Sequence, residues 1–534
     1  MLRTATTFAA AVAAALLLAA TVEAADTTAA KDTRLVEAIK SGNSEAAQAL
    51  LLKRVNPNTP ESDGTTPLHW ATRNNDITLM DRLLRAGANP KAANRFGVTP
   101  IQLACQNGSA AAVSRLLKSG VSSNATAEYG ETALMTCART GVVAAAKVLI
   151  EAGASVDAVE SWRGQTALMW AAAEGHADMV KALIAAGADK DARSTIVTWE
   201  RQRTQEPRDK WLPPGGLTPL LLAARQGRVD AAKALLDAGA DVNLVDPDRH
   251  TPLILALING HVDVATLLIE RGADVQMADK VGQTALWAAV DLHTVPMSNR
   301  PAPREFDEQA TSLEVIKMLL ARGASVDAAL RQQVPYRTKL DRGGDGALGT
   351  GTTPLLRAAK AADTAVIKLL LEKGANPNAT TSSGINALQM AANVGTKEED
   401  MTGRAKTQQD IIATTQLLLA AGLDINSTDS QGRSAAHGAA MWGLTDVVKF
   451  LHEKGAKLDL KDKRGLSPLD AALGKAGGFG FDGKSGVVRE DTAKVIADLL
   501  GPAAAAAATS KNAPPPASDA ARQRQLDGES DPNN

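Results

Sequence analysis

The sequence predicts an all-α repeat solenoid built from about twelve copies of a helix-turn-helix unit. Three observations lead to this prediction. A motif of the form Thr-Pro-Leu-X-X-Ala recurs in one register along the 534 residues, and a glycine follows most copies at a constant distance. The chain is 45% hydrophobic but only 3% aromatic, which indicates a folded protein with small side chains in its interior.

Copies of the motif define the repeats. They begin at Thr66, Thr99, Thr132, Thr166, Thr218, Thr251, Thr284, Thr353, Asn386, Ser434 and Ser467, with a degenerate copy at Thr33. Of the eleven intervals between starts, seven are 33 residues, one is 34 and three are longer, at 52, 69 and 48. Such a period predicts stacked units, because one unit alone cannot bury its apolar stripe.

Each unit has the signals of two helices. Thr66 can cap the first helix, Pro67 suits its first turn, and Leu68 with Ala71 gives a narrow apolar stripe. A second amphipathic helix follows and stops at Gly87, which can take the left-handed conformation. The corresponding glycine lies 21 residues after the start in eight of the eleven full copies. In the other three it is delayed, which indicates insertions inside those repeats.

Five insertions interrupt the regular period. Two lengthen the connection between repeats, and three lengthen the turn between paired helices. Long excursions from a rigid scaffold are where function tends to lie. The insertions are expected near residues 193–214, 292–311, 328–350, 394–410 and 474–490.

The repeats resemble the ankyrin-repeat family. Gly64–Ala71 fits G-x-TPLHxA, and Gly260–Asp274 fits GHxDxxxxLIxxGAD. The resemblance covers residues 29–501 and implies an ankyrin helix-turn-helix stack with β-turn fingers between units. It also implies a concave groove for a protein partner, of unknown identity here, and it implies no reaction.

The two ends of the chain lie outside this array. Arg3, the apolar run Phe8–Ala20, and the small residues Val22 and Ala24 predict a signal peptide over residues 1–24. An anchoring helix is the alternative, but the apolar run is short for a membrane span. We therefore expect an exported protein, periplasmic or extracellular, of bacterial appearance. Residues 502–534 are rich in Ala, Pro and polar residues and predict a disordered tail.

Cys105 and Cys137 are the two cysteines of the chain. Export permits a disulfide between them. They fall in neighbouring repeats, however, and packed helices lie roughly 8–10 Å apart, beyond comfortable disulfide reach. We therefore expect two buried thiols.

The stretch GFGFDGKS, residues 478–485, fits the phosphate-loop pattern G-x-x-x-x-G-K-[ST]. A phosphate loop needs a buried strand before it and a helix after it. Here it lies between the two predicted helices of the last repeat. We interpret it as a glycine-rich connection in which Lys484 is solvated.

Other chemistry is expected to be absent. His69 and His437 occupy the same repeat position, where ankyrin family members use histidine for hydrogen bonds, and no metal-ligand spacing occurs. The net charge of -1 does not favour nucleic-acid binding. We expect a monomer that is not an enzyme, with no catalytic residue, cofactor or metal, and no membrane span once the signal is removed.

The candidate partner-binding residues are aromatic and basic. The first insertion holds two tryptophans and has a net charge of +2, and Trp and Arg are enriched at interface anchors. The alternative is that these side chains pin the insertion to the scaffold. The predicted function is a non-catalytic protein-protein interaction scaffold; alternatives are an accessory factor that assembles or protects an exported enzyme and, less favoured, a nucleotide-binding enzyme. The predicted site residues are Trp70, Trp162, Trp170, Trp199, Arg201, Arg203 and Trp211.

Overall fold

A computed structural model describes residues 32–198, 214–294, 310–334, 347–395, 406–476 and 487–508. The internal gaps fall within the five predicted insertions, so only the ends of these insertions can be compared with the structure. The chain divides into two compact units. The first comprises Met1–Trp162, Thr166–Leu168 and Ala185–Ala188, and the second comprises Arg163–Gln165, Met169–Ile184 and Asp189–Asn534.

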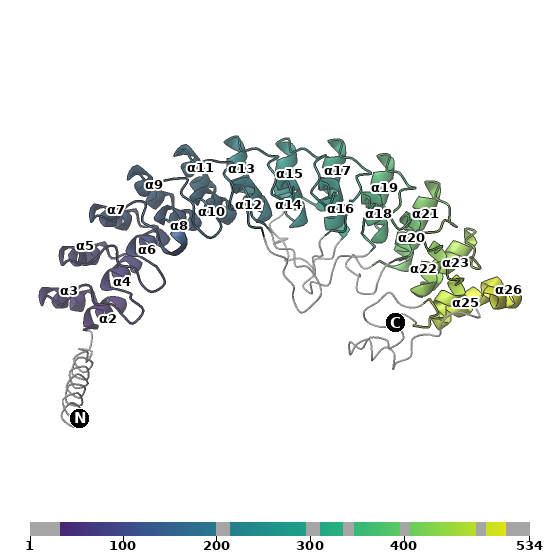
Figure 1. Cartoon of the computed structure of the whole chain (residues 1–534), viewed down its shortest axis with the longest axis horizontal. Helices are drawn as coiled ribbons and strands as arrows, with labels where there is room; N and C mark the ends of the chain where they lie inside the picture. The colour runs from purple at the N-terminus through teal and green to yellow at the C-terminus, as the bar shows by residue number, and fades with distance from the viewer. Residues whose placement is uncertain are drawn as a thin grey trace, which may run out of the picture. The chain divides into compact units, whose positions relative to one another are not determined.

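Twelve helix pairs follow one another in the described residues (Figure 1), which confirms the predicted repeat solenoid. The first helices of the pairs are α2 (Arg34–Lys40), α4 (Pro67–Arg73), α6 (Pro100–Gln106), α8 (Ala133–Thr140), α10 (Ala167–Glu174), α12 (Pro219–Arg225), α14 (Pro252–Ile258), α16 (Ala285–Thr294), α18 (Pro354–Lys360), α20 (Ala387–Ala391), α22 (Ala435–Met441) and α24 (Pro468–Ala472). The second helices are α3 (Ser44–Leu52), α5 (Ile77–Arg85), α7 (Ala110–Lys118), α9 (Val143–Glu151), α11 (Ala177–Ala185), α13 (Val229–Asp237), α15 (Val262–Glu270), α17 (Ser312–Ala321), α19 (Thr364–Glu372), α21 (Gln408–Ala420), α23 (Thr445–Glu453) and α25 (Glu490–Leu500).

Two short elements lie outside this pattern. The 3-10 helix η1 (Glu128–Gly130) forms the tip of the connection before repeat 4. Helix α26 (Pro502–Ala508) follows the last pair. It occupies the start of the segment that the sequence analysis assigned to a disordered tail, so the helical structure extends further than expected. The remainder of that segment, 509–534, lies outside the described residues.

The starts of most first helices are set by their capping residues. In repeat 2 the Thr66 hydroxyl lies 2.7 Å from His69 Nδ1, and the Thr66 backbone N–H donates to the same nitrogen at 3.1 Å. Pro67 takes the first helical position, where a missing N–H costs nothing. The other ring nitrogen, His69 Nε2, lies 3.0 Å from the carbonyl oxygen of Val98. This histidine therefore caps its own helix and holds the next inter-repeat connection, as the family resemblance implied.

The core of each unit lies between neighbouring repeats. In the first unit α2, α4, α6 and α8 pack in sequence order, as do α3, α5, α7 and α9; in the second unit the same two rows run from α12 to α24 and from α13 to α25. Leu68, Ala71 and Leu83 are fully buried, and their counterparts in later repeats are buried as well. Small side chains at these contacts let the first helices approach closely.

The connections between repeats form hairpin-like fingers, which we number by the repeat that follows them. Among the described residues, isolated antiparallel bridges close three of them: Thr126 with Thr132, Ile196 with Gly215, and Ala278 with Thr284. The second of these bridges closes the base of the insertion at 193–214. Only this base is described, and Arg193 fastens it by donating to the carbonyl of Val245 at 2.6 Å.

The expectation of two buried thiols is wrong, because Cys105 and Cys137 form a disulfide between α6 and α8. Their Cα atoms lie 4.7 Å apart, within the range that a disulfide spans. The expectation used the distance between helix axes, whereas residues on the line of contact lie much closer than the axes. Ala104 and Ala138 beside the cysteines are fully buried, and their small side chains permit this approach.

Removal of the disulfide should destabilise the first unit. We expect Cys105→Ala combined with Cys137→Ala to lower the free energy of unfolding by about 2–4 kcal/mol, because the cross-link restricts the unfolded chain. Urea unfolding of both proteins measures the difference, and a reductant should weaken the natural chain but leave the double variant unchanged. Labelling of both cysteines by an alkylating reagent, in denaturant without reductant, would contradict the disulfide.

His250 joins two neighbouring fingers in the second unit through ionisable contacts. Its Nδ1 lies 2.9 Å from Oδ2 of Asp246, and its Nε2 lies 3.6 Å from Oδ2 of Asp279 on the next finger. Burial acts to lower the pKa of His250, but the hydrogen bond to Asp246 and the charges of Asp246, Asp279 and Asp248 raise it above the ordinary value. The protonated imidazole is therefore the form that the fold stabilises.

This contact should make stability depend on pH. Since the pKa of His250 is raised in the folded state, its contribution is complete below the ordinary value of 6.5 and is lost as the pH rises through the folded-state pKa. We expect His250→Gln to lower the melting temperature more at about pH 6 than at about pH 8.5. Thermal unfolding at both pH values tests this. An equal loss at both would show that His250 is neutral in the fold.

Candidate functional site

Trp70, on α4 in the first unit, is held by three neighbours. Its indole Nε1 donates to Oε2 of Glu61 at 2.7 Å. Lys40 Nζ lies 5.0 Å and the Arg73 guanidinium carbon 5.5 Å from the ring centroid, and Lys40 also pairs with Glu61 at 2.9 Å. Trp70 is half-buried. It therefore ties the finger of repeat 2 to the first helices, and part of its surface stays accessible.

Trp162 lies on the finger of repeat 5 and is 68% exposed. Its ring centroid lies 6.1 Å from that of Tyr129 on the preceding finger, with the ring planes inclined at 45°. Phe96, one finger earlier, is also exposed, and the Arg95 guanidinium carbon lies 4.8 Å from its ring centroid. The predicted site residue Trp162 thus belongs to a set of exposed aromatic fingertips.

Phe96 and Tyr129 are not among the predicted site residues. A signal was present, since each stands three residues before a repeat start and directly before a glycine. The prediction rested on tryptophans, which are large and few, and did not include the two smaller aromatics that share one finger position.

The remaining predicted residues do not join this set. Trp170 lies on α10 and is half-buried. Trp70 belongs to repeat 2, several repeats before the finger that carries Trp162. Four predicted residues lie outside the described part of the chain, and nothing in the structure bears on them: Trp199, Arg201, Arg203 and Trp211.

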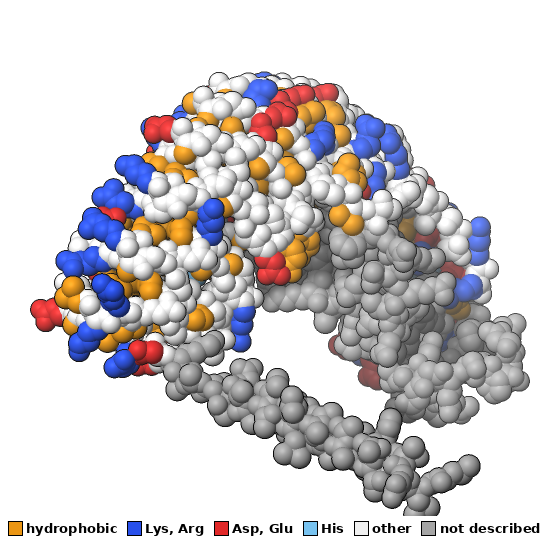
Figure 2. All heavy atoms as spheres, turned by 60° about the vertical axis from the view of Figure 1, so that its left-hand side comes forward, with side chains coloured by type: hydrophobic (Ala, Val, Ile, Leu, Met, Phe, Trp, Pro, Cys, Tyr) orange, Lys and Arg blue, Asp and Glu red, His pale blue; other side chains and the backbone are white. Residues whose placement is uncertain are grey.

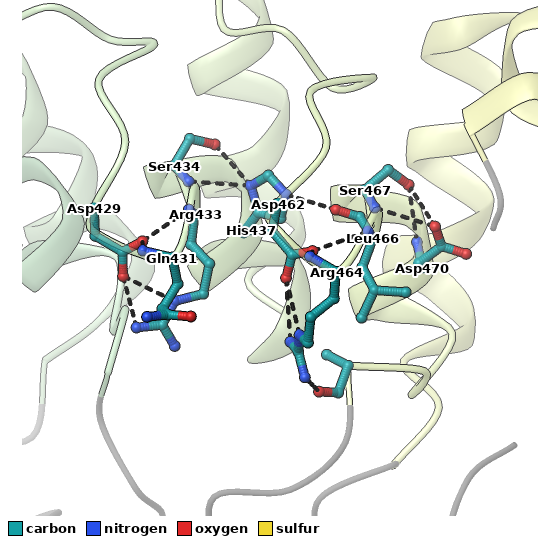
Figure 3. A network of polar contacts seen from close by, with 11 residues as sticks. Asp429, Gln431, Arg433, Ser434, His437, Asp462, Arg464, Leu466, Ser467 and Asp470 are labelled. Carbon is teal, nitrogen blue, oxygen red and sulfur yellow. Dashed lines mark hydrogen bonds and ion pairs between the residues drawn. The ribbon is translucent and has the colours of Figure 1, made fainter. Parts of the chain in front are cut away.

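Buried carboxylates organise the fingers of repeats 11 and 12 (Figure 3). Asp429 accepts hydrogen bonds from the backbone of Gln431 and Arg433 at 2.9 and 2.8 Å and pairs with the Arg433 guanidinium at 2.6 Å. One repeat later, Asp462 likewise accepts hydrogen bonds from the backbone of Arg464 and Leu466 and pairs with the Arg464 guanidinium. Each carboxylate thus fixes a tight turn, because it satisfies backbone donors that would otherwise lack partners.

His437 links the two fingers shown in Figure 3. Its Nδ1 lies 3.0 Å from the Ser434 hydroxyl, and its Nε2 lies 3.1 Å from the carbonyl oxygen of Leu466. Burial lowers the pKa of His437, and burial likewise lowers that of His69. Both therefore serve as neutral hydrogen-bonding groups, and a small pocket beside His437 is bordered by the paired side chains of Arg433, Asp462 and Arg464. These hydrogen bonds and ion pairs therefore stabilise the two fingers.

Buried cations in repeats 9 and 10 also have structural partners. The fully buried Arg357 pairs with Asp291 at 2.8 Å. The amine of Lys406 donates to the carbonyls of Lys360 and Ala391 at 2.8 and 2.9 Å. Burial of the amine, with the nearby charges of Lys360 and Arg357, lowers the pKa of Lys406 to about 7. Two backbone carbonyls accept hydrogen bonds from this amine. The amine therefore links neighbouring repeats and is not placed as a nucleophile.

The surface charge of the N-terminal repeats is mixed. Figure 2 shows Lys and Arg side chains over these repeats, interspersed with apolar ones. Helix α5 ends with Arg82 and Arg85, and α7 ends with Arg115 and Lys118. Cations at helix C-termini interact favourably with the helix dipole, and Arg115 pairs with Asp81 at 2.9 Å. The position of these basic residues in the last turns of their helices is therefore explained by helix stability.

The described ranges contain neither a group of metal-ligating residues nor a membrane-spanning helix. No group of three His, Cys, Asp or Glu residues there could hold a metal ion, and no helix there is long and apolar enough to span a membrane. The phosphate-loop pattern at 478–485 lies outside the described residues. The element before it is helix α24, and the element after it is helix α25, so the strand that a phosphate loop requires does not precede it.

Comparison with known proteins places the repeats in a family. A family model described as ankyrin repeats (3 copies) matches overlapping segments that together span residues 8–297 and 405–478. A model of a single ankyrin repeat matches residues 350–382. The matched residues make up more than half of the chain.

Curated relatives share part of this array. Cyclin-dependent kinase inhibitor 2A of Monodelphis domestica is 33% identical over 119 residues, 22% of this chain and 60% of the relative. NF-kappa-B inhibitor delta of Mus musculus is 43% identical over 58 residues, 10% of this chain and 18% of the relative. Human cyclin-dependent kinase 4 inhibitor B is 33% identical over 107 residues, 20% of this chain and 66% of the relative. The chain thus spans less than two thirds of the length of each.

A solved structure of the human ASB11 ankyrin repeat domain aligns with 45% of this chain and 98% of its own length, at 26% identity and a TM-score of 0.38. The family assignment rests on the family-model matches and on the helix pairs that recur with the 33-residue period. The chain belongs to the ankyrin repeat family.

Proposed function

We propose that this chain is a non-catalytic scaffold that binds another protein along the side formed by its fingers and first helices. The exposed aromatic side chain of Trp162, on a finger fixed to its neighbours, is the observation that carries this proposal. A stacked array is ordered when it folds, so binding requires little further ordering. Large aromatic rings in such positions supply contact area with few rotatable bonds.

The similar proteins give further support. The three curated relatives reported above are named as inhibitors of cyclin-dependent kinases or of NF-kappa-B, that is, of other proteins. Several ionisable groups in the described residues are engaged in turns, caps and hydrogen bonds between repeats, as with Asp429, His437 and Lys406. A binding role uses the array as it stands and needs no reacting group.

We also propose that the chain is an exported bacterial protein, periplasmic or extracellular. The N-terminal pattern of residues 1–24 supports export. The disulfide between Cys105 and Cys137 supports it independently, because disulfides persist in oxidising compartments and are rare in the cytosol. In such a compartment the scaffold could assemble or protect an exported enzyme, which is the second candidate function.

Trp170 and Trp70 allow the binding proposal to be tested. Trp170→Ala should weaken binding of the natural partner about 30-fold, which corresponds to about 2 kcal/mol. Trp70→Ala should lower the melting temperature, because it also releases Glu61, Lys40 and Arg73.

The natural partner would be identified by co-purification from the exported fraction, and its affinity measured by calorimetry. Leu52→Ala serves as the control, since Leu52 is 83% exposed at the end of a second helix. A partner whose affinity is unchanged by Trp170→Ala would contradict the proposed use of this side of the array.

The mature protein should begin at Ala25, because Val22 and Ala24 occupy the two small-residue positions before a signal-peptidase cut. The intact mass of the protein from the exported fraction decides this. A mass that retains Met1, together with membrane association, would contradict a cleaved signal.

A further inference from the structure

The finger of repeat 12, residues 454–466, has the largest excess of positive charge among the fingers that the structure describes from end to end. It lies between α23, which ends at Glu453, and the start of repeat 12 at Ser467. Two aspartates accompany its five cations, which are Lys454, Lys457, Lys461, Lys463 and Arg464. All five cations are exposed. We call residues 454–466 the basic finger.

The acids near the basic finger leave most of this charge uncompensated. Asp462 is buried and is already engaged by the backbone of the finger and by Arg464. Asp459 on the finger and Asp424, at the matching position of the preceding finger, are exposed. Neither forms an ion pair with a described residue, and the side chains of Lys457 and Lys463 have no ion pair or hydrogen bond there either.

Hydrogen bonds fix the backbone of the basic finger. Within it, the Asp462 carboxylate closes the turn that Figure 3 shows. On one side, the N–H of Lys463 donates to the carbonyl of Gln431 at 2.9 Å, and the N–H of Lys457 donates to Asn426 Oδ1 at 2.8 Å. On the other side, the amine of Lys461 donates to the carbonyl of Ala507 in α26 at 3.3 Å. A partner would therefore have to order only side chains, which limits the entropy cost of binding.

The exposed surface of the basic finger lacks large apolar side chains. The large apolar residues that are exposed elsewhere in the described residues include no member of 454–466, so this finger offers nothing to insert into a membrane or to stack on a nucleic-acid base. The finger of repeat 11 carries Asp424 and Asp429 against Arg433. The basic surface therefore does not continue along the array, as the backbone of a nucleic acid would require.

We infer that the basic finger docks an acidic segment of the partner protein, in which several aspartates or glutamates lie close together. This inference rests on the proposed protein-binding function and specifies the charge of the partner. Lysine and arginine donate to carboxylates, and the cations are confined to one loop, which suits a short segment of chain.

The strength of such a contact follows from its exposure. A single ion pair in water contributes little to affinity, whereas several that form together on an ordered loop add up. Exposed charges are also screened by salt. The contact should therefore depend on the number of carboxylates in the segment and weaken as the ionic strength rises.

A short labelled peptide tests the inference with the full chain. The probe alternates glutamate with glycine and serine, and the matched peptide has glutamine in place of every glutamate. At low salt, fluorescence anisotropy should show at least about tenfold tighter binding of the glutamate peptide. Its advantage should shrink between about 50 and about 300 mM salt, because the charges are screened.

Variants then locate the binding surface. Lys457→Gln combined with Lys463→Gln should weaken binding of the glutamate peptide at least about tenfold. The melting temperature should not change, because both backbone hydrogen bonds remain and neither side chain has a described partner. Lys147→Gln combined with Lys233→Gln is the matched control. It removes the same charge from exposed positions of α9 and α13 and should leave peptide binding unchanged.

Four results would overturn the inference. The first is equal affinity for the two peptides at low salt. The second is an equal loss of binding in the control variant, which would show an effect of net charge. The third is displacement of the peptide from the finger by a labelled oligonucleotide or by anionic phospholipid vesicles that bind more tightly. The fourth is peptide binding that appears only after Asp527→Asn combined with Glu529→Gln, because the chain's own acidic residues would then be the occupant.

Trp170→Ala separates this inference from the proposed function. Trp170 lies on α10 in repeat 5, so its removal should leave binding of the glutamate peptide unchanged. If the natural partner depends on Trp170 but not on Lys457 and Lys463, only the inference on the basic finger fails. If the natural partner depends on the two lysines but not on Trp170, the proposed contact at Trp170 fails and the inference stands.

Discussion

Packing of each repeat against the next is the interaction on which the rest of the structure depends. A single helix pair exposes its apolar stripe, and only the neighbouring pair can cover it. Leu68 and Ala71 in repeat 2 are fully buried for this reason, and the same positions are buried in later repeats. The close approach of the first helices follows from their small side chains. That approach also brings the Cα atoms of Cys105 and Cys137 to 4.7 Å, so a disulfide crosses the contact between repeats 3 and 4.

The fingers are ordered by polar groups that the packing leaves in fixed places. Histidines at the start of first helices reach the carbonyl of the next finger, as His69 does with Val98 and His437 with Leu466. Aspartates inside the fingers satisfy the donors of tight turns, as Asp429 and Asp462 do. These buried histidines and aspartates therefore stabilise the fold. Buried charge in the described residues is therefore explained by turns, helix caps and hydrogen bonds between repeats.

Hydrogen bonds and close backbone contacts fix neighbouring fingers relative to one another. Phe96, Tyr129 and Trp162 stand on neighbouring fingers whose backbones contact or hydrogen-bond one another, so their rings keep their relative positions without a partner. Trp70, by contrast, contacts Glu61, Lys40 and Arg73, which hold its ring against the scaffold. Aromatic residues are thus exposed or held against the scaffold according to the side chains that surround them.

The sequence by itself determined the repeat architecture. The 33-residue period, the Thr-Pro starts and the glycine stops act locally, through caps and backbone preferences, and each recurs often enough to be read without a structure. The sequence also supplied Trp162 as a candidate. The disulfide and the contact of Tyr129 with Trp162 could not be predicted from the sequence, because they depend on atomic distances between residues about 32 positions apart. Such distances are set by the side chains packed between the repeats, and only the tertiary structure decides them.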